Sequence, residues 1–236
     1  MRRFAALHRD DPRIVVPAVV DDASGARVLT TEYAEAMPFE AAREAPEPLR
    51  RQWAETLWTF AYGSIMCGGI FNADPHPGNY LFHDDGRVVF LDFGCVQEVD
   101  PFHRRQIVIA HRALGDGDFE GCMTAMAPVL RAKPGVHTEV MNDYMTLALR
   151  PIIASPFRIT PEYAASVVDR FKTMALTVRK LQRNDFEHLP PGLLFLMRLQ
   201  FGFYSVLARL DVTVDYAAVE AAYLPRAWAA VDATHI

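Results

Sequence analysis

The chain has 236 residues, of which 51% are hydrophobic and 22% are charged, and its formal net charge is −5. This length suits one large domain or two modest ones, and the composition allows a sizeable core. A net acidic chain without a basic stripe argues against a general nucleic-acid binder.

Three cysteines, Cys67, Cys95 and Cys122, are far apart and form no CxxC pair. They predict neither a zinc site nor a disulfide framework, and reduced thiols are typical of a cytoplasmic protein. The first residues lack the apolar stretch of a signal peptide. The longest apolar stretch, 193–210, is interrupted by charged side chains, so we expect a core or interface helix and no transmembrane segment.

Two β-rich runs open the chain, at 13–19 and 26–33, and a turn sequence at 21–25 separates them. This order predicts a hairpin. A connector rich in proline, glutamate and alanine follows at 34–48. A helix is then predicted from about 49 to 67, because its apolar residues recur on one face.

The predicted helix has a plausible left-handed stop at Gly68-Gly69. Two prolines and a glycine make 72–79 a loop. The short apolar runs 80–82 and 88–91 predict a second hairpin, with its turn at Asp84-Asp85-Gly86.

Beyond residue 94 every predicted element is a helix. Thr160 precedes Pro161, which is the order of a capping residue and the first helical position. The predicted helices are 101–114, 119–130, one that starts at Thr160, one from Pro190-Pro191 to 210, and 214–230.

The loop and the second hairpin carry three polar residues in a significant order. Asp74 and Asn79 are separated by four residues, which is the D-x-x-x-x-N spacing of a phosphotransferase catalytic loop. Asp92 begins an Asp-Phe-Gly sequence directly after the hairpin. A short hairpin brings the residues at its open end together, so we expect Asn79 and Asp92 to lie side by side.

These residue types fit a magnesium site. Magnesium takes oxygen ligands in near-octahedral geometry, and one carboxylate, one amide oxygen, nucleotide phosphates and water supply them. Asp74 would orient a nucleophile, while Asn79 and Asp92 would hold the metal. The competing interpretation is that Asp74 and Asp92 are turn or cap residues of an ordinary loop.

The sequence around these residues resembles the UbiB/AarF-type atypical kinase family, called ADCK in eukaryotes. The family block reads approximately F-H-A-D-P-H-P-G-N, then a hairpin, then L-D-F-G. Here residues 71–79 read FNADPHPGN and residues 91–94 read LDFG. The resemblance extends more loosely through the later helices, including 189–193 (LPPGL).

The resemblance implies an α+β, protein-kinase-like fold. Residues 1–36 would be a remnant of the N-lobe, with two strands and the inter-lobe link, and residues 37–236 would form a mainly helical C-lobe. It implies ATP and Mg²⁺ as cofactors, Asp74 as the catalytic aspartate, and Asn79 and Asp92 as magnesium ligands. Backbone groups near Glu32 and Tyr33 would meet the adenine.

The same resemblance implies an ATPase or unorthodox kinase linked to ubiquinone and other isoprenoid-lipid metabolism. Its partners would be a nucleotide and an isoprenoid lipid or lipid-biosynthesis proteins. The expected location is the cytoplasm, with peripheral contact at the inner membrane face.

Two departures from the family pattern stand out. Asn72 occupies the position where the family has histidine. The N-lobe also lacks its phosphate-handling parts, because no lysine precedes Lys133 and Gly25 is the only glycine before Gly63. We therefore expect the magnesium-binding residues of a kinase site without the lysine and the glycine-rich loop that contact the phosphates.

The departures keep other functions open. One alternative is a non-catalytic fragment or pseudokinase that acts as a binding or regulatory module, since charge in the transition state would be poorly neutralised. Another is a small-molecule kinase of the aminoglycoside or choline type.

Four other features are assigned structural roles. We expect His76 to shape the loop, not to bind metal, and Cys95 to be a small apolar residue. The apolar residues of 193–210 are expected to be core, with contact to a lipid tail as the alternative. Arg104-Arg105 is expected to lie on a solvated face.

Overall fold

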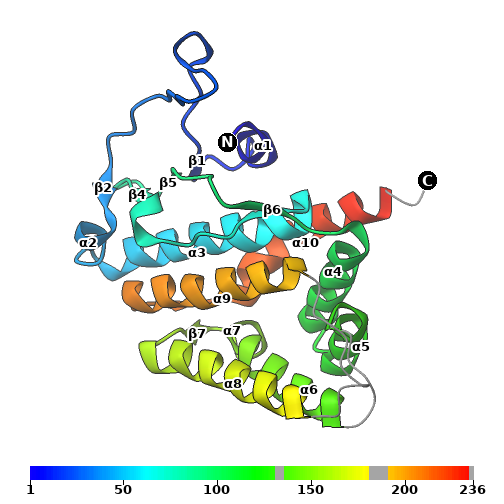
Figure 1. Cartoon of the computed structure of the whole chain (residues 1–236). Coiled ribbons are helices and arrows are strands. Elements are labelled where there is room, and N and C mark those ends of the chain that lie inside the picture. Colours follow the sequence, from blue (N-terminus) through cyan, green and yellow to red (C-terminus); the bar gives the residue numbers. More distant parts are fainter. Residues whose placement is uncertain (131–135, 181–190, 234–236) are drawn as a thin grey trace.

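The computed structural model describes residues 1–130, 136–180 and 191–233. The largest sheet and an N-terminal arm lie on one side of a larger body of helices, as Figure 1 shows. This arrangement confirms the predicted α+β, kinase-like fold with a mainly helical C-terminal part.

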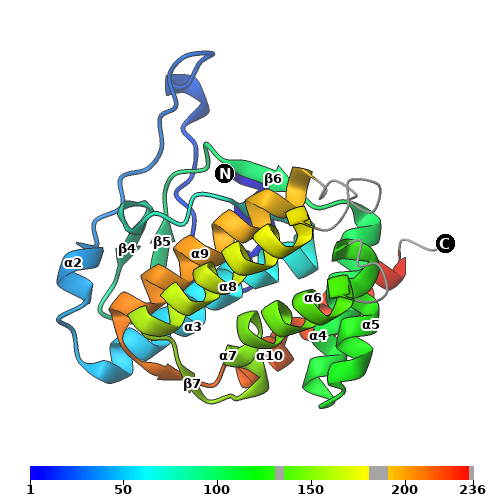
Figure 2. The ribbon, with the colours of Figure 1, turned by 60° about the horizontal axis from the view of Figure 1, so that its bottom comes forward.

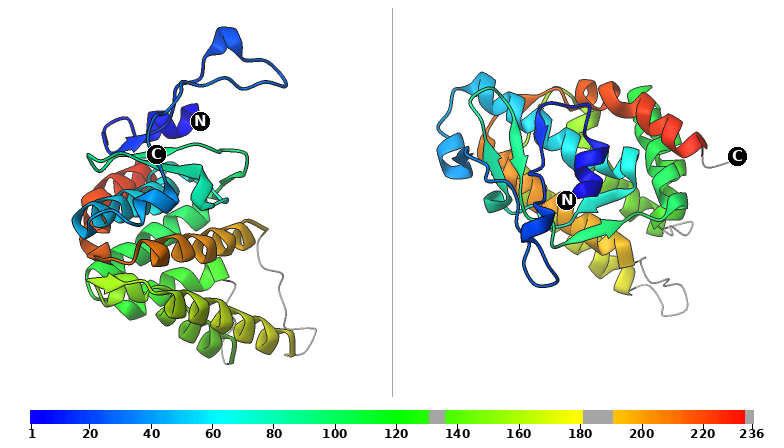
Figure 3. Two further views of the ribbon diagram at one scale, coloured as in Figure 1. Left: turned by 90° about the vertical axis from the view of Figure 1, so that its left-hand side faces the viewer. Right: turned by 90° about the horizontal axis from the view of Figure 1, so that it is seen from above.

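The N-terminal region holds a helix that was not predicted, α1 (Arg2–Leu7), followed by the short strand β1 (Ile14–Val15). The predicted first hairpin is formed only in part. Its two runs meet through isolated bridges, Val19 with Thr31 and Gly25 with Val28, and the turn contains a 3₁₀ helix, η1 (Asp21–Ala23). The hairpin projects from the body as an arm (Figures 1 and 3).

The connector after this arm is partly ordered as β2 (Met37–Pro38) and α2 (Phe39–Ala42), which the sequence did not indicate. The predicted central helix is confirmed as α3 (Glu47–Gly63), which continues into a π-helical turn, η2 (Ser64–Gly68). Gly69 ends it with φ +62°, the left-handed conformation that glycine adopts without strain.

The predicted second hairpin is confirmed as β4 (Tyr80–Phe82) and β5 (Val88–Phe90). The larger sheet has the order β1-β5-β4-β2, and β1 runs parallel to β5. A second pair joins β3 (Ile70–Asn72) to β6 (Val96–Glu98). The expectation that everything after residue 94 is helical was wrong, because strands follow there too: β6, β7 (Phe157–Arg158) and β8 (Thr213–Val214).

Seven helices complete the described chain: α4 (Pro101–Gly115), α5 (Phe119–Leu130), α6 (Val136–Ala148), α7 (Arg150–Ile153), α8 (Pro161–Lys180), α9 (Pro191–Leu210) and α10 (Tyr216–Asp232). The predicted cap of α8 is confirmed, since the Thr160 hydroxyl accepts a hydrogen bond from the Tyr163 N–H at 3.2 Å. Pro190 lies outside the described residues.

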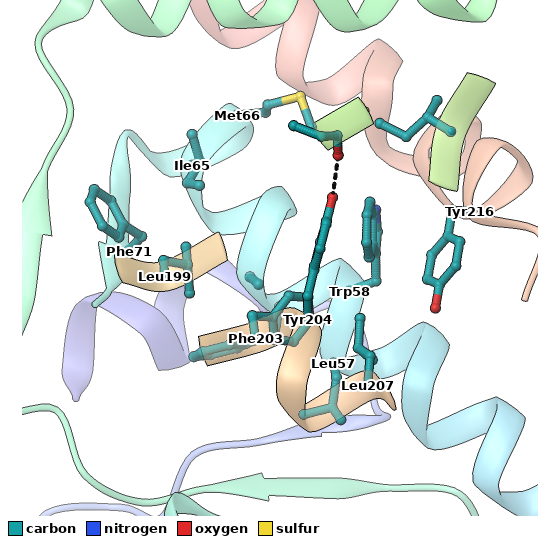
Figure 4. Packing of buried hydrophobic residues seen from close by; sticks show 14 of the residues in the cluster. Leu57, Trp58, Ile65, Met66, Phe71, Leu199, Phe203, Tyr204, Leu207 and Tyr216 are labelled. Atoms are coloured by element: carbon teal, nitrogen blue, oxygen red, sulfur yellow. Dashed lines mark hydrogen bonds between the residues drawn. The ribbon is translucent and has the colours of Figure 1, made fainter. Parts of the chain in front are cut away.

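The core is built around α3 and α9. Trp58, Phe203 and Tyr204 pack together there, and the Tyr204 hydroxyl donates to the Ala148 carbonyl at 2.7 Å (Figure 4). Phe203 and Leu207 are buried in this core, as expected for the apolar residues of 193–210. Within the described ranges, no helix is both long enough and apolar enough to cross a membrane.

A buried polar group ties three helices together inside this core. Trp58 on α3 donates to one oxygen of Glu220 on α10 at 3.0 Å, and His111 on α4 meets the other at 2.7 Å. Burial acts to lower the pKa of His111, but the neighbouring Glu220 carboxylate outweighs it and the pKa is raised.

Candidate functional site

The predicted catalytic loop lies between β3 and β4, beneath the N-terminal arm. It is fixed at its start by the Ala73 N–H, which donates to the Cys95 carbonyl at 2.8 Å. Its end is the 3₁₀ turn η3 (Pro77–Asn79). Backbone hydrogen bonds from His76 to Asp74 (2.8 Å) and from Asn79 to His76 (2.9 Å) hold the loop in a compact form.

Asp74 and Asn79 meet directly. The Asn79 amide donates to the Asp74 backbone carbonyl at 3.1 Å and to its carboxylate Oδ2 at 3.3 Å. The compact turn returns the chain to its starting point, so residues separated by four others come into contact. With its amide nitrogen engaged, the Asn79 side-chain oxygen is left as a ligand for a cation.

The hairpin brings Asp92 next to Asn79 along the backbone. The Leu91 N–H donates to the Asn79 carbonyl at 3.0 Å, and Asp92 is the residue that follows Leu91. The Asp92 carboxylate accepts the Gly94 N–H at 2.7 Å, which orients it within the Asp-Phe-Gly turn. The structure thus brings Asp74, Asn79 and Asp92 to one end of the hairpin.

Asn72 links the two halves of this group. Its side-chain nitrogen donates to the Asp92 carbonyl, and its side-chain oxygen accepts the Asp74 N–H at 3.2 Å. The residue that replaces the family histidine therefore bridges the loop and the Asp-Phe-Gly segment.

His76 shapes the loop, as predicted. Its Nδ1 accepts the Gly78 N–H at 3.1 Å, and a Cβ built on Gly78 would lie 3.1 Å from the same nitrogen. The imidazole therefore closes a tight local turn.

Arg198 is a site residue that the sequence did not reveal. It lies on α9, and its guanidinium donates to Asp74 Oδ1 at 2.8 Å. Asp74 is half-buried, and Arg198 is more exposed. Four residues further along α9, Gly202 approaches Pro75 so closely that an added Cβ would lie 2.5 Å from its ring. Helix α9 therefore contacts the catalytic loop at two successive turns.

Tyr80 follows the loop on β4 and is buried. Burial, together with the negative charge of Asp74, raises the pKa of the Tyr80 hydroxyl well above its ordinary value.

An open cavity of about 890 Å³ lies in front of Asp92, between α1, the arm and the Asp-Phe-Gly segment. Phe4, Leu29 and Thr31 line it together with Asp92, and the cations on its wall are Arg2 and Arg3. Phe93 packs against Phe4, with ring centroids 5.0 Å apart. The cavity is large enough for a nucleotide-sized ligand.

Glu32 and Tyr33 are not among the residues lining this cavity. The Glu32 N–H already donates to the Ala18 carbonyl at 2.9 Å, and Tyr33 is 92% exposed. The segment reaches the cavity through Leu29 and Thr31 instead. An adenine contact at Glu32 and Tyr33 stays a prediction.

Arg104 differs from the expected solvated residue. Its guanidinium donates to the carbonyls of Met66 at 3.0 Å and Cys67 at 2.6 Å, and thereby satisfies the end of the α3–η2 helix. One Arg105 nitrogen is buried without a partner. This pair therefore includes a helix cap, which charge patterning alone does not show.

Comparison with known proteins identifies the family. Residues 1–126, more than half of the chain, match the model of the ABC1 atypical kinase-like domain. The chain belongs to this family. The matched residues include the loop, the hairpin and the Asp-Phe-Gly segment, whereas Arg198 lies outside the match.

The chain is similar to proteins from a plant and a mammal. The chain is 34% identical over 112 residues to the chloroplastic protein ACTIVITY OF BC1 COMPLEX KINASE 3 of Arabidopsis thaliana, covering 47% of this chain and 16% of that protein. It is 24% identical over 212 residues to the mitochondrial atypical kinase COQ8B of Rattus norvegicus, covering 89% and 40%. The chain thus spans well under half the length of these ABC1 relatives.

A solved structure shares the fold. The structure of the complex of Rv3197 with erythromycin, from Mycobacterium tuberculosis, matches with a TM-score of 0.63 and 24% identity, covering 93% of this chain and 54% of that one. The likeness therefore extends beyond the ABC1 match into the C-terminal helices.

Proposed function

We propose that the chain forms the metal- and phosphate-binding half of an ATP- and Mg²⁺-dependent atypical kinase or ATPase site. The observation that carries this proposal is the grouping of Asp74, Asn79 and Asp92 at one end of the β4–β5 hairpin, fixed by Asn72 and by backbone hydrogen bonds. The ABC1 membership supports the reaction class.

In this proposal Asn79 and Asp92 bind magnesium through side-chain oxygens. No cluster of three or more histidine, cysteine or acid side chains is placed to hold a metal in the part of the chain that the structure describes. A magnesium ion held by one amide and one carboxylate takes its other ligands from nucleotide phosphates and water. Metal binding should therefore depend on the nucleotide.

Asp74 would accept the proton of the attacking hydroxyl or orient a water molecule. The contacts from Asn79 and Arg198 engage both of its carboxylate oxygens, which fixes its orientation. Asp74 is half-buried and Asp92 is exposed. Of the three site residues Asp92 lines the open cavity, whereas Asp74 and Asn79 do not.

The proposed site has few cations that could neutralise the nucleotide phosphates. No lysine precedes Lys133, and the cations that line the cavity are Arg2 and Arg3 on α1. Both are engaged in exposed ion pairs, with Asp21 and Glu98 respectively. We assign these arginines as the cations that would meet the nucleotide phosphates when the ion pairs open.

The metabolic role and the partners are proposed from the family resemblance. We propose a role in ubiquinone or other isoprenoid-lipid metabolism, with lipid or lipid-biosynthesis proteins as partners and peripheral contact with a membrane. The names of the relatives place those proteins in mitochondria and chloroplasts.

Nucleotide titration with and without magnesium tests the proposal. The wild-type chain should bind ATP with Mg²⁺ and lose this affinity in EDTA, and Asp92→Asn should remove the magnesium dependence. Asp84→Asn, in the turn of the same hairpin, is the matched control and should bind as wild type does. Equal Mg-ATP affinities of Asp92→Asn and wild type would show that Asp92 holds no metal.

A non-catalytic nucleotide-binding module is the second candidate, favoured by the engagement of the cavity-lining Arg2 and Arg3 in ion pairs. Single-turnover incubation with γ-labelled ATP separates the two. Release or transfer of labelled phosphate that Asp74→Asn abolishes indicates the enzyme, while binding without turnover indicates the module. The ABC1 match argues against the small-molecule kinase alternative.

A further inference from the structure

A second cavity lies inside the helical body, separate from the one that contains Asp92. Its volume is about 90 Å³, and its walls come from the end of α3 with η2, from α4, α5 and α6, and from α9. Most of the lining is aliphatic or methionine. Figures 1 and 2 show these helices meeting below the sheets.

Three polar side chains on the cavity wall have partners in the protein. The Tyr144 hydroxyl donates to Gln200 Oε1 at 2.7 Å, and the Gln200 amide nitrogen reaches the Ala148 carbonyl at 3.4 Å. His111 Nδ1 is paired with Glu220. Water needs two to four polar partners to occupy a cavity, so this one offers an apolar ligand a better match than it offers water.

Three methionines, Met126, Met145 and Met197, line the cavity. Methionine has a flexible, polarizable side chain that repacks around ligands of different shape. An engineered cavity of about 150 Å³ with apolar walls binds benzene or xenon. At about 90 Å³ this cavity is smaller, so the methionine side chains must move aside to admit a ring. We propose that the cavity between α4, α5, α6 and α9 binds an aromatic ring of about benzene size.

Helix α9 connects this site to the catalytic loop. Met197 and Leu199 line the cavity, while Arg198 between them reaches Asp74 on another side of the helix. A ligand that presses on Met197 and Leu199 shifts this turn of α9, and the shift carries Arg198 with it because the three residues are consecutive in the helix. The occupied cavity therefore alters the orientation of Asp74, and this part of the inference rests on the proposed function.

Benzene and xenon are the probes, and methyl NMR of methionine-labelled protein is the readout. Saturating benzene should shift the signals of Met126, Met145 and Met197. Met66, which is fully buried and does not line the cavity, should stay unchanged. Ala110→Leu, which fills the cavity from α4, should abolish the shifts. Ala208→Leu, at a buried alanine of α9 outside the lining, is the matched control.

Unshifted cavity methionines in wild type, or undiminished shifts in Ala110→Leu, would overturn the site. Met145→Ala enlarges the cavity and should tighten benzene binding about threefold or more; unchanged or weaker binding would also overturn it. The coupling is read separately, as a change in Mg-ATP affinity on adding benzene. Methionine shifts without that change refute the coupling alone, and a wild type that binds no nucleotide refutes the proposed function while the NMR result stands.

Discussion

Arg198 and Asp74 are 124 residues apart in the sequence, yet the guanidinium of one donates to the carboxylate of the other at 2.8 Å. Asn79 occupies the second carboxylate oxygen at 3.3 Å. Asp74 is therefore fixed from two directions, by its own loop and by α9. An ion pair this exposed contributes little to stability, so we infer that it serves to orient Asp74.

Arg198→Ala should lower the turnover of Mg-ATP by about tenfold, because Asp74 would no longer be held in position for the reaction. Its free energy of unfolding should change by no more than about 1 kcal/mol, as for other exposed ion pairs. Arg198→Lys should recover part of the turnover. Steady-state hydrolysis and urea denaturation measure the two quantities.

Arg170→Ala supplies the matched control, since Arg170 pairs with Asp143 at a comparable exposure but lies on α8. It should leave turnover unaltered. An Arg198→Ala protein that hydrolyses ATP as wild type does would remove Arg198 from the site.

Gly202→Ala should disturb the catalytic loop, because the added Cβ would lie 2.5 Å from the ring of Pro75. We expect a destabilisation of about 1–3 kcal/mol, typical of overpacking, and weaker nucleotide binding. Gly192→Ala on the same helix has open space around it and should be neutral or stabilising by up to about 1 kcal/mol. Equal stabilities of the two variants would show that α9 does not press on the loop.

Local sequence signals predicted much of this fold. The helix that ends at Gly69, the β4–β5 hairpin and the cap at Thr160 each depend on neighbours within a few residues, and all three are confirmed. The loop residues Asp74 and Asn79 meet for the same reason. Short-range spacing fixes short-range geometry.

The missed features depend on tertiary packing. An arginine on an apolar helix, such as Arg198, looks the same in sequence whether it meets solvent or a catalytic aspartate. The capping role of Arg104 cannot be read from the sequence. Its acceptors, the carbonyls of Met66 and Cys67, are backbone atoms that every residue has. Strand β6 was missed because its three residues are ordered by pairing with β3.

His8 should make the stability depend on pH. It is 2% exposed, and burial lowers its pKa to about 4, with the charge of Arg226 adding to the effect. Stability is therefore full above the unfolded pKa of about 6.5 and is lost as the pH falls toward 4, by roughly 3 kcal/mol in all. Urea denaturation of wild type and His8→Gln across this range should show the slope only in wild type. Parallel curves for both proteins would assign the slope to other groups.

Glu220 should be the acid on which stability depends most strongly. It is 3% exposed and bonded to both Trp58 and His111, so Glu220→Ala leaves two buried polar groups without their partner. We expect a loss of about 3–5 kcal/mol in chemical denaturation. Glu40→Ala, which breaks exposed pairs with Arg43 and Arg209, should leave stability nearly unchanged. A Glu220→Ala protein as stable as Glu40→Ala would contradict the structural role of the buried group.

The most direct test of the central claim is the anomalous scattering of Mn²⁺ in crystals grown with a non-hydrolysable ATP analogue. The account predicts a manganese peak bound by the Asn79 side-chain oxygen and the Asp92 carboxylate at about 2 Å, with phosphate oxygens completing the shell. A bound nucleotide whose manganese lies away from both residues would contradict it, as would crystals in which neither ion nor nucleotide occupies the cavity beside Asp92.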